Sequence, residues 1–137
     1  MLDTHIVLDV LQARAGFVDE SQAVFEMVEA NAISGLLCAT TITTLAYLAA
    51  KTLGRQQAAR QIRQLLVLFE VAPVNRAVLD GALKSKTPDF EDAVLAEAAL
   101  HAGAEAIITR NLRDFASSPV RAYTPTQWLA MHPRQAE

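Results

Sequence analysis

Short apolar runs alternate along this chain with longer segments of helical periodicity, and this alternation is the feature that most constrains the fold. Turn and capping residues bound the runs, which we expect to be buried strands. The expected strands are Met1–Leu2, Gly35–Ala39, Phe69–Ala72, Ala104–Thr109 and Val120–Tyr123. Strands separated by helices are joined by right-handed crossovers, which produce a parallel sheet with helices on both faces. The sequence therefore predicts an α/β fold in which helices flank a central, mainly parallel sheet of about five strands.

Capping residues and helix breakers place the helices between these strands. The expected helices are Ile6 to Ala13 with an end near Gly16, Glu20 to Ala30, a segment capped by Thr40 or Thr41 that stops at Gly54, Arg55 to Leu68, Arg76 to Lys84 capped by Asn75, and a long helix from Pro88 or Asp89 to Ala102. The last helix is expected at Thr124-Pro125-Thr126-Gln127, which combines an N-cap, a proline at the first helical position and a glutamine in capping-box position.

The length and composition indicate one soluble domain covering residues 1–137. Hydrophobic residues make up 52% of the 137 residues and charged residues 20%, which is enough apolar material for a core. No apolar run approaches the roughly 20 residues needed to span a bilayer, and Asp3 and His5 interrupt any apolar leader. The single cysteine, Cys38, lies in an apolar run and is expected to be a buried core residue in a reducing compartment. We therefore expect a cytoplasmic protein with no membrane segment.

The net charge of −3 argues against a protein that coats nucleic acid through charge alone. It is compatible with an enzyme whose bound metal ions meet the phosphate, because acids gathered in one pocket contribute to such a balance. The sequence contains no Gly-rich phosphate loop, no nucleophile elbow and no cysteine pair for zinc.

Several acids fall where strands should end and helices begin. Asp3 follows the first expected strand, and Asp92 lies in the first turn of the long helix. Asp114 follows the fourth strand, together with Asn111. Ligands bind open parallel sheets outside the carboxyl ends of the strands, so we expect these side chains to meet there. Carboxylates held close together repel one another unless a cation lies between them, and Mg²⁺ and Mn²⁺ prefer carboxylate and water oxygens. The pattern predicts a divalent-metal site that can hydrolyse phosphodiester bonds.

Each of these acids has a simpler interpretation when it is taken alone. Asp3 is also typical of a strand end, and Asp114 of an ordinary loop. Asp89, Glu91 and Asp92 lie where acids cap helix N–H groups, and capping is the favoured interpretation of each in isolation. The convergence of three independent acids on one edge of the sheet favours a shared site.

Three charged residues near these acids leave alternatives open. Asp9 lies one helical turn beyond His5 and can face either the site or solvent. Arg110 and Arg113 flank the Asn111–Asp114 loop, where they could hold phosphate or simply be solvated.

Four local sequences carry a further signal. They are Leu2-Asp3-Thr4-His5, Asp89-Phe90-Glu91-Asp92-Ala93-Val94, Ile108-Thr109-Arg110-Asn111-Leu112-Arg113-Asp114-Phe115 and Tyr123-Thr124-Pro125. In this order and spacing they resemble PIN domains, and more narrowly the VapC-type ribonuclease toxins of bacterial toxin–antitoxin pairs, over nearly the whole chain. The resemblance implies a Rossmann-like, three-layer fold and endonucleolytic cleavage of RNA with Mg²⁺ or Mn²⁺. It also implies a homodimer and inhibition by a small antitoxin protein.

Carried over by position, the resemblance makes Asp3, Asp92 and Asp114 metal-site acids and Asn111 a polar residue beside the last. The family usually has another acid, a glutamate, in the helix after the second strand, and Thr44 occupies that place here. A threonine hydroxyl can hold a metal-bound water but supplies no charge. The first strand is also very short in this chain.

The leading hypothesis is a metal-dependent endoribonuclease of toxin type, in which Asn111 orients water or phosphate. Asp9, Thr44, Glu91 and Arg110 are further candidates for the site. One alternative is a weakened or inactive module of the same fold that binds RNA or a protein partner without cutting, because Thr44 replaces the glutamate. A second alternative, a phospho-acceptor signalling domain, is disfavoured because Pro73 ends the central strand and no lysine follows the last one.

Overall fold

The computed structural model describes residues 1–13 and 18–133, and its strands are parallel and short. The strands are β1 (Leu36–Cys38), β2 (Glu70–Ala72), β3 (Ile107–Ile108) and β4 (Ala122–Tyr123). β1 pairs with β2, and β3 pairs with β4. The N-terminal segment lies between these two pairs, because Leu2 bridges Ile108 and donates its N–H to the Leu36 carbonyl oxygen at 3.0 Å. The order across the sheet is therefore β2, β1, residues 1–3, β3 and β4.

An α-helix follows the N-terminal segment, β1, β2 and β4, and a 3₁₀ turn follows β3. The helices are α1 (Thr4–Leu11), α2 (Val18–Glu29), α3 (Ala39–Leu53), α4 (Arg55–Leu68), α5 (Arg76–Lys84), α6 (Phe90–His101) and α7 (Pro125–Met131), with a short 3₁₀ turn η1 (Leu112–Phe115) after β3. Two residues set the bounds of α4 and α5 as predicted. Gly54 adopts a left-handed conformation, with φ of 83°, and separates α3 from α4. The Asn75 side chain accepts a hydrogen bond from the Val78 N–H at 3.1 Å and begins α5.

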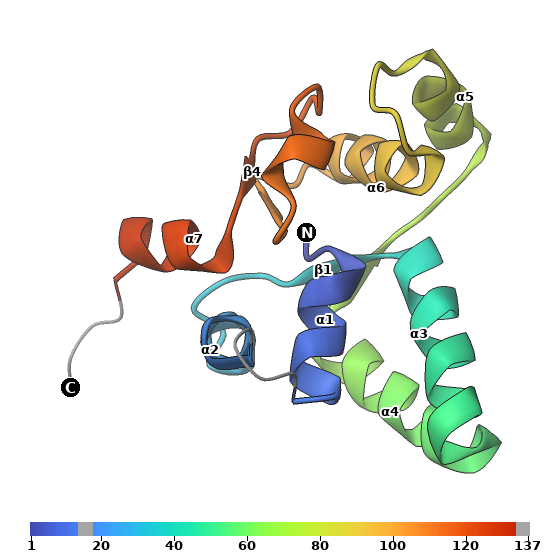
Figure 1. The fold of residues 1–137 in the computed structure, drawn as a ribbon, viewed down its shortest axis with the longest axis vertical. Helices are drawn as coiled ribbons and strands as arrows, with labels where there is room; N and C mark the ends of the chain where they lie inside the picture. Colours follow the sequence, from blue (N-terminus) through green and yellow to red (C-terminus); the bar gives the residue numbers. More distant parts are fainter. Residues whose placement is uncertain (14–17, 134–137) are drawn as a thin grey trace.

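Neighbouring strand residues face opposite sides of the sheet and fill two separate cores. Cys38 and Ile107 pack with α6 in one core, whereas Leu37 and Ile108 pack with α1, α2 and α4 in the other. Figure 1 shows α5 and α6 on one side of the strands and α1, α2 and α4 on the other. The predicted three-layer α/β arrangement is thereby confirmed, and Cys38 is buried as expected.

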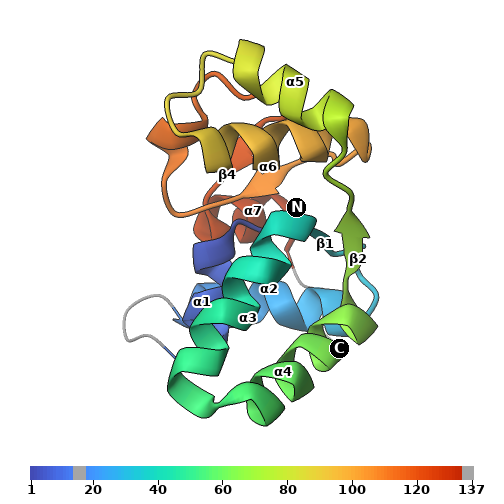
Figure 2. The same cartoon turned by 90° about the vertical axis from the view of Figure 1, so that its right-hand side faces the viewer.

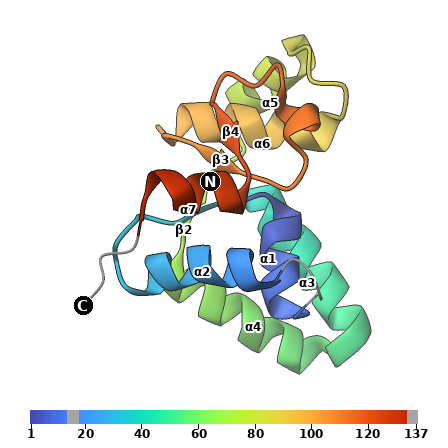
Figure 3. The same ribbon diagram turned by 60° about the vertical axis from the view of Figure 1, so that its left-hand side comes forward.

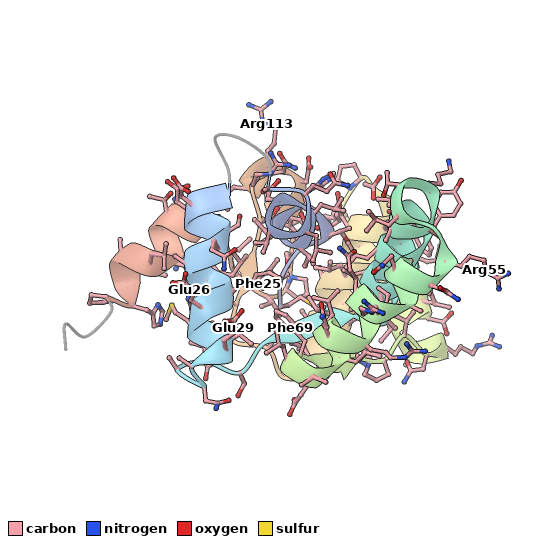
Figure 4. The ribbon with its side chains drawn as sticks, turned by 90° about the horizontal axis from the view of Figure 1, so that it is seen from below. Phe25, Glu26, Glu29, Arg55, Phe69 and Arg113 are labelled. Atoms are coloured by element: carbon pink, nitrogen blue, oxygen red, sulfur yellow. The ribbon has the colours of Figure 1, made fainter. Side chains whose placement is uncertain are left out.

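The helices also contact one another outside the sheet. α3 and α4 pack side by side, as do α5 and α6 (Figure 2). α7 packs on α2, and Figure 3 shows the two helices side by side. The Phe25 ring of α2 meets the Phe69 ring in an edge-to-face contact, with centroids 5.2 Å apart (Figure 4). Such a contact ties α2 to the end of α4.

Several predicted boundaries differ from the structure. The prediction that Thr40 or Thr41 caps α3 is wrong: Cys38 is the N-cap and has no side-chain capping bond, so the chain passes directly from β1 into the helix. α1 begins earlier than predicted because Asp3 caps it, and it ends at Leu11. The predicted end near Gly16 lies outside the described residues. Within the part of the chain that the structure describes, no helix is long and apolar enough to cross a membrane.

Candidate metal-binding site

Asp3 lies at the point where the first strand becomes α1. Its backbone N–H donates to the Ile108 carbonyl oxygen at 2.9 Å, which keeps the residue in the sheet. Its carboxylate accepts the Thr4 N–H at 2.8 Å on one oxygen and the Thr109 hydroxyl at 2.8 Å on the other. The residue is 6% exposed, and these bonds satisfy the carboxylate without neutralising it.

The first turn of α6 divides its acids between two tasks. The Asp89 side chain accepts the Asp92 N–H at 3.0 Å and caps the helix. Asp92 is half-buried, and its own carboxylate faces a small pocket together with Glu91 and Asp3. Asp89 is therefore a helix cap, as the simpler interpretation predicted. The carboxylate of Asp92 is not needed for capping and is available to bind a ligand.

The pocket has a volume of about 140 Å³ and lies between α1, α3 and α6. Polar side chains dominate its lining, which consists of Asp3, Thr4, His5, Leu8, Thr40, Thr41, Thr44, Leu48, Glu91, Asp92 and Leu95. Thr44 thus occupies the predicted place, facing the acids from α3, but brings only a hydroxyl. Glu91 supplies a carboxylate to the same pocket from α6.

The acids of the site influence one another's protonation. Burial is the main cause that raises the pKa of the Asp92 carboxyl from 3.8 to about 7. Neighbouring negative charges add to this shift, in falling order Asp89, Asp3, Asp114 and Glu91. Burial also raises the pKa of Asp3; its hydrogen bonds oppose that shift and the charge of Asp114 adds to it. Asp3, Asp92 and Asp114 therefore share one electrostatic neighbourhood, as their sequence positions predicted.

Asn111 and Asp114 lie on the segment that follows β3. The Asn111 N–H donates to the Thr109 hydroxyl oxygen at 3.0 Å, and the Asp114 N–H donates to the Asn111 carbonyl oxygen at 3.0 Å. The segment forms the 3₁₀ turn η1 rather than the irregular loop that we expected, with Phe115 buried as its anchor. Both Asn111 and Asp114 are exposed, and neither belongs to the lining of the pocket.

A chain of hydroxyl groups supports Asp3, and the sequence analysis did not single it out. The Thr41 hydroxyl lies 3.0 Å from the Thr4 hydroxyl, Thr4 donates its N–H to Asp3, and Thr109 links Asp3 to Asn111. Thr41 and Thr109 are buried polar residues. The signal that could have found Thr109 is its place directly after the two isoleucines of β3, where a polar side chain must reach the carboxyl end of the sheet.

The donor groups fit a hard divalent cation in their chemistry. Carboxylate oxygens are the ligands that Mg²⁺ and Mn²⁺ prefer, and a cation would remove the repulsion that raises the pKa of Asp92. Among residues 1–13 and 18–133, no three His, Cys, Asp or Glu side chains lie close enough together to hold an ion as they stand. The acids are therefore neighbours through their charges and do not yet form a closed coordination shell.

Asp9 and Arg110 lie elsewhere than predicted. We expected Asp9 to face the site or solvent, but it is fully buried. We expected Arg110 to hold phosphate or to be solvated, but its Nε lies 3.1 Å from the Asp9 Oδ2 in an ion pair. Both expectations are wrong because each charge is the other's partner inside the fold. Arg113, in contrast, projects away from the body of the molecule (Figure 4).

The comparison with protein families identifies the domain. A family model for the PIN domain matches residues 1–113, a span that includes Asp3, Asp92 and Asn111. The chain belongs to the PIN domain family. The match stops just before Asp114, so the assignment of that acid depends on its place in this structure. No curated protein sequence matches this PIN domain.

Solved structures of toxin–antitoxin complexes share the fold of this PIN domain. A chain of VapBC2 from Rickettsia felis, bound to a DNA fragment from its promoter, has a TM-score of 0.71 at 16% identity and covers 90% of this chain and 96% of its own. A chain of VapBC-1 from nontypeable Haemophilus influenzae has a TM-score of 0.71 at 19% identity, with coverages of 92% and 97%. A toxin–antitoxin complex from Klebsiella pneumoniae has a TM-score of 0.68 at 23% identity, with coverages of 90% and 95%.

Proposed function

We propose that this PIN domain is a metal-dependent endoribonuclease of the VapC toxin type, which hydrolyses RNA phosphodiester bonds. The observation that carries the proposal is the effect of Asp3 and Asp114 on the protonation of Asp92. The charges of carboxylates from three separate segments act on one another, and this repulsion is unfavourable unless a cation is present.

Each residue has a defined task in this proposal. Asp3, Asp92 and Asp114 hold Mg²⁺ or Mn²⁺, and the exposed Asn111 orients water or phosphate. Thr109 fixes the Asp3 carboxylate, and through Asn111 it also fixes the start of η1. When bound, the cation lowers the pKa of a coordinated water and neutralises charge on the phosphate.

Glu91 is placed to compensate for the glutamate that is missing at position 44. Both residues line the same pocket, Thr44 from α3 and Glu91 from the first turn of α6. We propose that Glu91 supplies the negative charge that the family usually places on α3, while Thr44 holds a water. Glu91 then supplies part of the missing charge from a different helix.

The second candidate function is a PIN module that binds RNA or a protein partner without cutting. The hydroxyl of Thr44 favours this candidate, because a site with three acids attracts a cation less strongly than a site with four. A wild-type chain that cleaves RNA fully in the presence of Mn²⁺ would refute this candidate.

We also propose an antitoxin partner, which the complexes formed by the similar structures support. A groove of about 420 Å³ between α3 and α4 suits an apolar helix with acidic flanks. It is lined by Ala46, Ala50, Ala58, Ala59 and Ile62, with Arg55 and Arg63 at its edges. Arg55 projects from this end of the molecule (Figure 4). An antitoxin that bound equally well to an Ala50→Arg variant would contradict this placement.

The remaining expectations from the sequence stay proposals. Val24 and Phe25 of α2 are buried in the core and cannot form a partner or dimer surface. Tyr47 on α3 is 60% exposed and can contribute to one. The homodimer is checked by sedimentation of the purified chain, which should show twice the mass of 14.9 kDa. A cytoplasmic location is consistent with this function.

The test of the nuclease is cleavage of a labelled, structured RNA by the purified chain, with and without Mn²⁺. Asp92→Asn, which keeps the size of the side chain, is measured beside it. Cleavage that requires Mn²⁺ and disappears in the variant supports the proposal. Retained cleavage in Asp92→Asn would contradict it, and absence of cleavage by folded wild type would favour the non-cutting module.

A further inference from the structure

The Asp9–Arg110 ion pair lies inside the fold and takes no part in the acidic pocket. Asp9 is fully buried on α1, and the Arg110 side chain is 22% exposed. Ser21 of α2 brings its hydroxyl to within 3.5 Å of the same carboxylate oxygen, Oδ2. The other oxygen, Oδ1, has no hydrogen-bond partner within the described part of the chain. A buried carboxylate of this kind is tolerated only next to a positive charge, so Asp9 depends on Arg110.

Two adjacent residues after β3 thereby bind the two ends of α1. Thr109 donates to Asp3, the N-cap of α1, and Arg110 pairs with Asp9 in its second half. Asp3 and Asp9 are separated by six residues, which corresponds to about 9 Å along a helix at about 1.5 Å per residue. The segment that leads into η1 therefore has two side-chain attachments to α1, in addition to the buried Phe115 that anchors the turn itself.

The position of that segment matters for the acids of the site. Asp114 lies four residues beyond Arg110, and its charge acts on both Asp3 and Asp92. Without a cation the three carboxylates repel one another, and the position of Asp114 depends on how the short η1 turn is held. The Asp9–Arg110 pair has no net charge. It can hold η1 against this repulsion without adding charge to the site.

We propose that Asp9 and Arg110 are positioning residues, which hold η1 so that Asp114 stays within reach of the cation bound by Asp3 and Asp92. This inference rests on the proposed metal site, but the pair itself does not contact the metal or the RNA. A buried ion pair adds little net stability compared with an apolar pair of similar size, so its specific value is geometric.

The experiment measures Mn²⁺ binding by calorimetry in four purified full-length chains. They are wild type, Asp9→Asn, the double variant Asp9→Leu/Arg110→Met, and the control Arg113→Gln. Asp9→Asn should weaken Mn²⁺ binding about 10- to 100-fold, as loss of a supporting partner does in metal sites. Cleavage in this variant should show a lower kcat with an unchanged KM for RNA. Arg113→Gln removes a single charge, of the opposite sign, from η1 outside the pair and should change Mn²⁺ affinity less than about twofold.

The double variant separates position from stability. Replacing both charges by apolar side chains should return the melting temperature to near that of wild type, because no buried charge is left alone. It cannot restore the electrostatic link between α1 and the segment before η1, so Mn²⁺ affinity should stay low and amide hydrogens of residues 111–115 should exchange at least about tenfold faster than in wild type. Mn²⁺ affinity that returns together with stability would overturn the inference.

Hydrogen exchange also distinguishes this inference from the proposed function. If wild type binds no Mn²⁺, the proposed function fails, but exchange at residues 111–115 still reports on the pair. Faster exchange confined to that segment in the double variant would support the positioning role. Unchanged exchange there would overturn it, whatever the metal does.

Discussion

The two ends of α1 carry the same chemical group under opposite conditions. Asp3 at the first end is 6% exposed and accepts hydrogen bonds from a backbone N–H and a hydroxyl, both neutral. Asp9 towards the second end is fully buried and lies 3.1 Å from a guanidinium nitrogen. Burial raises the pKa of Asp3, and the opposing effects of its two hydrogen bonds and of the nearby His5 are smaller. One carboxylate has its cation built into the chain, and the other lacks one.

This difference distinguishes an acid that stabilises the fold from an acid that can bind a cation, although both lie at the ends of one helix. A buried carboxylate with a fixed arginine has no further need of a ligand. A buried carboxylate that is held in place by neutral donors, beside two other acids, is unfavourable by itself and gains most from a cation brought from solution. The distinction does not depend on exposure, because both side chains are nearly inaccessible.

The largest expected effect comes from removing the charge at the first end. Asp3→Asn keeps the size of the side chain and loses the negative charge, so Mn²⁺-dependent RNA cleavage should fall about 10²- to 10⁴-fold, which corresponds to several kcal/mol of metal-assisted stabilisation. Initial rates with a labelled RNA give the measurement. Asp80→Asn, an exposed acid on α5, is the control and should cleave as wild type does. Normal rates in Asp3→Asn would mean that the site lies elsewhere.

Removing the charge at the second end should affect stability instead. Asp9→Asn leaves Arg110 without its buried partner and should cost about 3 kcal/mol, the lower end for such pairs because Arg110 is partly exposed. Thermal unfolding should show a melting temperature lower by roughly 10 °C. Asp3→Asn should not lower the melting temperature in EDTA, since burial disfavours the charged form there. Equal losses in the two variants would erase the contrast between the ends of α1.

Adding a carboxylate at position 44 should increase the difference between the two ends of α1. Thr44→Glu places a charge in the pocket beside Asp3 and Glu91 and should tighten Mn²⁺ binding about tenfold, or about 1.4 kcal/mol. The same change should lower the melting temperature in EDTA by a few degrees through repulsion. Calorimetry measures the first effect, and Thr44→Gln is the uncharged control. Weaker Mn²⁺ binding in Thr44→Glu would show that Glu91 already completes the set.

The smallest expected effect is a dependence of stability on pH. The pKa of Asp92 is raised from 3.8 to about 7, so the folded chain binds more protons than the unfolded chain within that window. Stability without a divalent cation should therefore fall as pH rises from about 4 to about 7. Melting temperatures in EDTA across this range provide the measurement, and Asp92→Asn should flatten the slope. Saturating Mn²⁺ at pH 8 should raise the melting temperature of wild type more than that of the variant. A rise in stability with pH that Asp92→Asn leaves intact would point to other groups.

Local signals predicted much of the fold. α4 and α5 have their predicted bounds because Gly54 and Asn75 act through their own conformations and side chains, within a few residues. The capping box of α7 formed as expected for the same reason, with Thr124 and Gln127 exchanging hydrogen bonds. The start of α3 was missed because Cys38 ends β1 and caps the helix at once, so no polar cap marks the boundary in the sequence.

The site was predictable only in part. The rule that ligands meet the carboxyl edge of a parallel sheet predicted that Asp3, Asp92 and Asp114 would meet; in the structure their charges act on one another, and their role as metal ligands stays a prediction. No comparable rule pairs Asp9 with Arg110, which lie on different elements far apart in the sequence and look like independent surface charges. The support of Asp3 by Thr109 was missed for the same reason, because the direction of a side chain at a strand end depends on the packed sheet.

The position of residues 1–3 between β1 and β3 has a consequence for protein synthesis. Asp3 is held by Thr109, which lies 106 residues later in the chain. A ribosome that adds about 5–20 residues per second takes roughly 5–20 s to cover that distance. Until then residues 1–3 have β1 on one side but no β3 on the other, and the acids of the site cannot come together. The proposed metal site can therefore form only after Thr109 has been added to the chain.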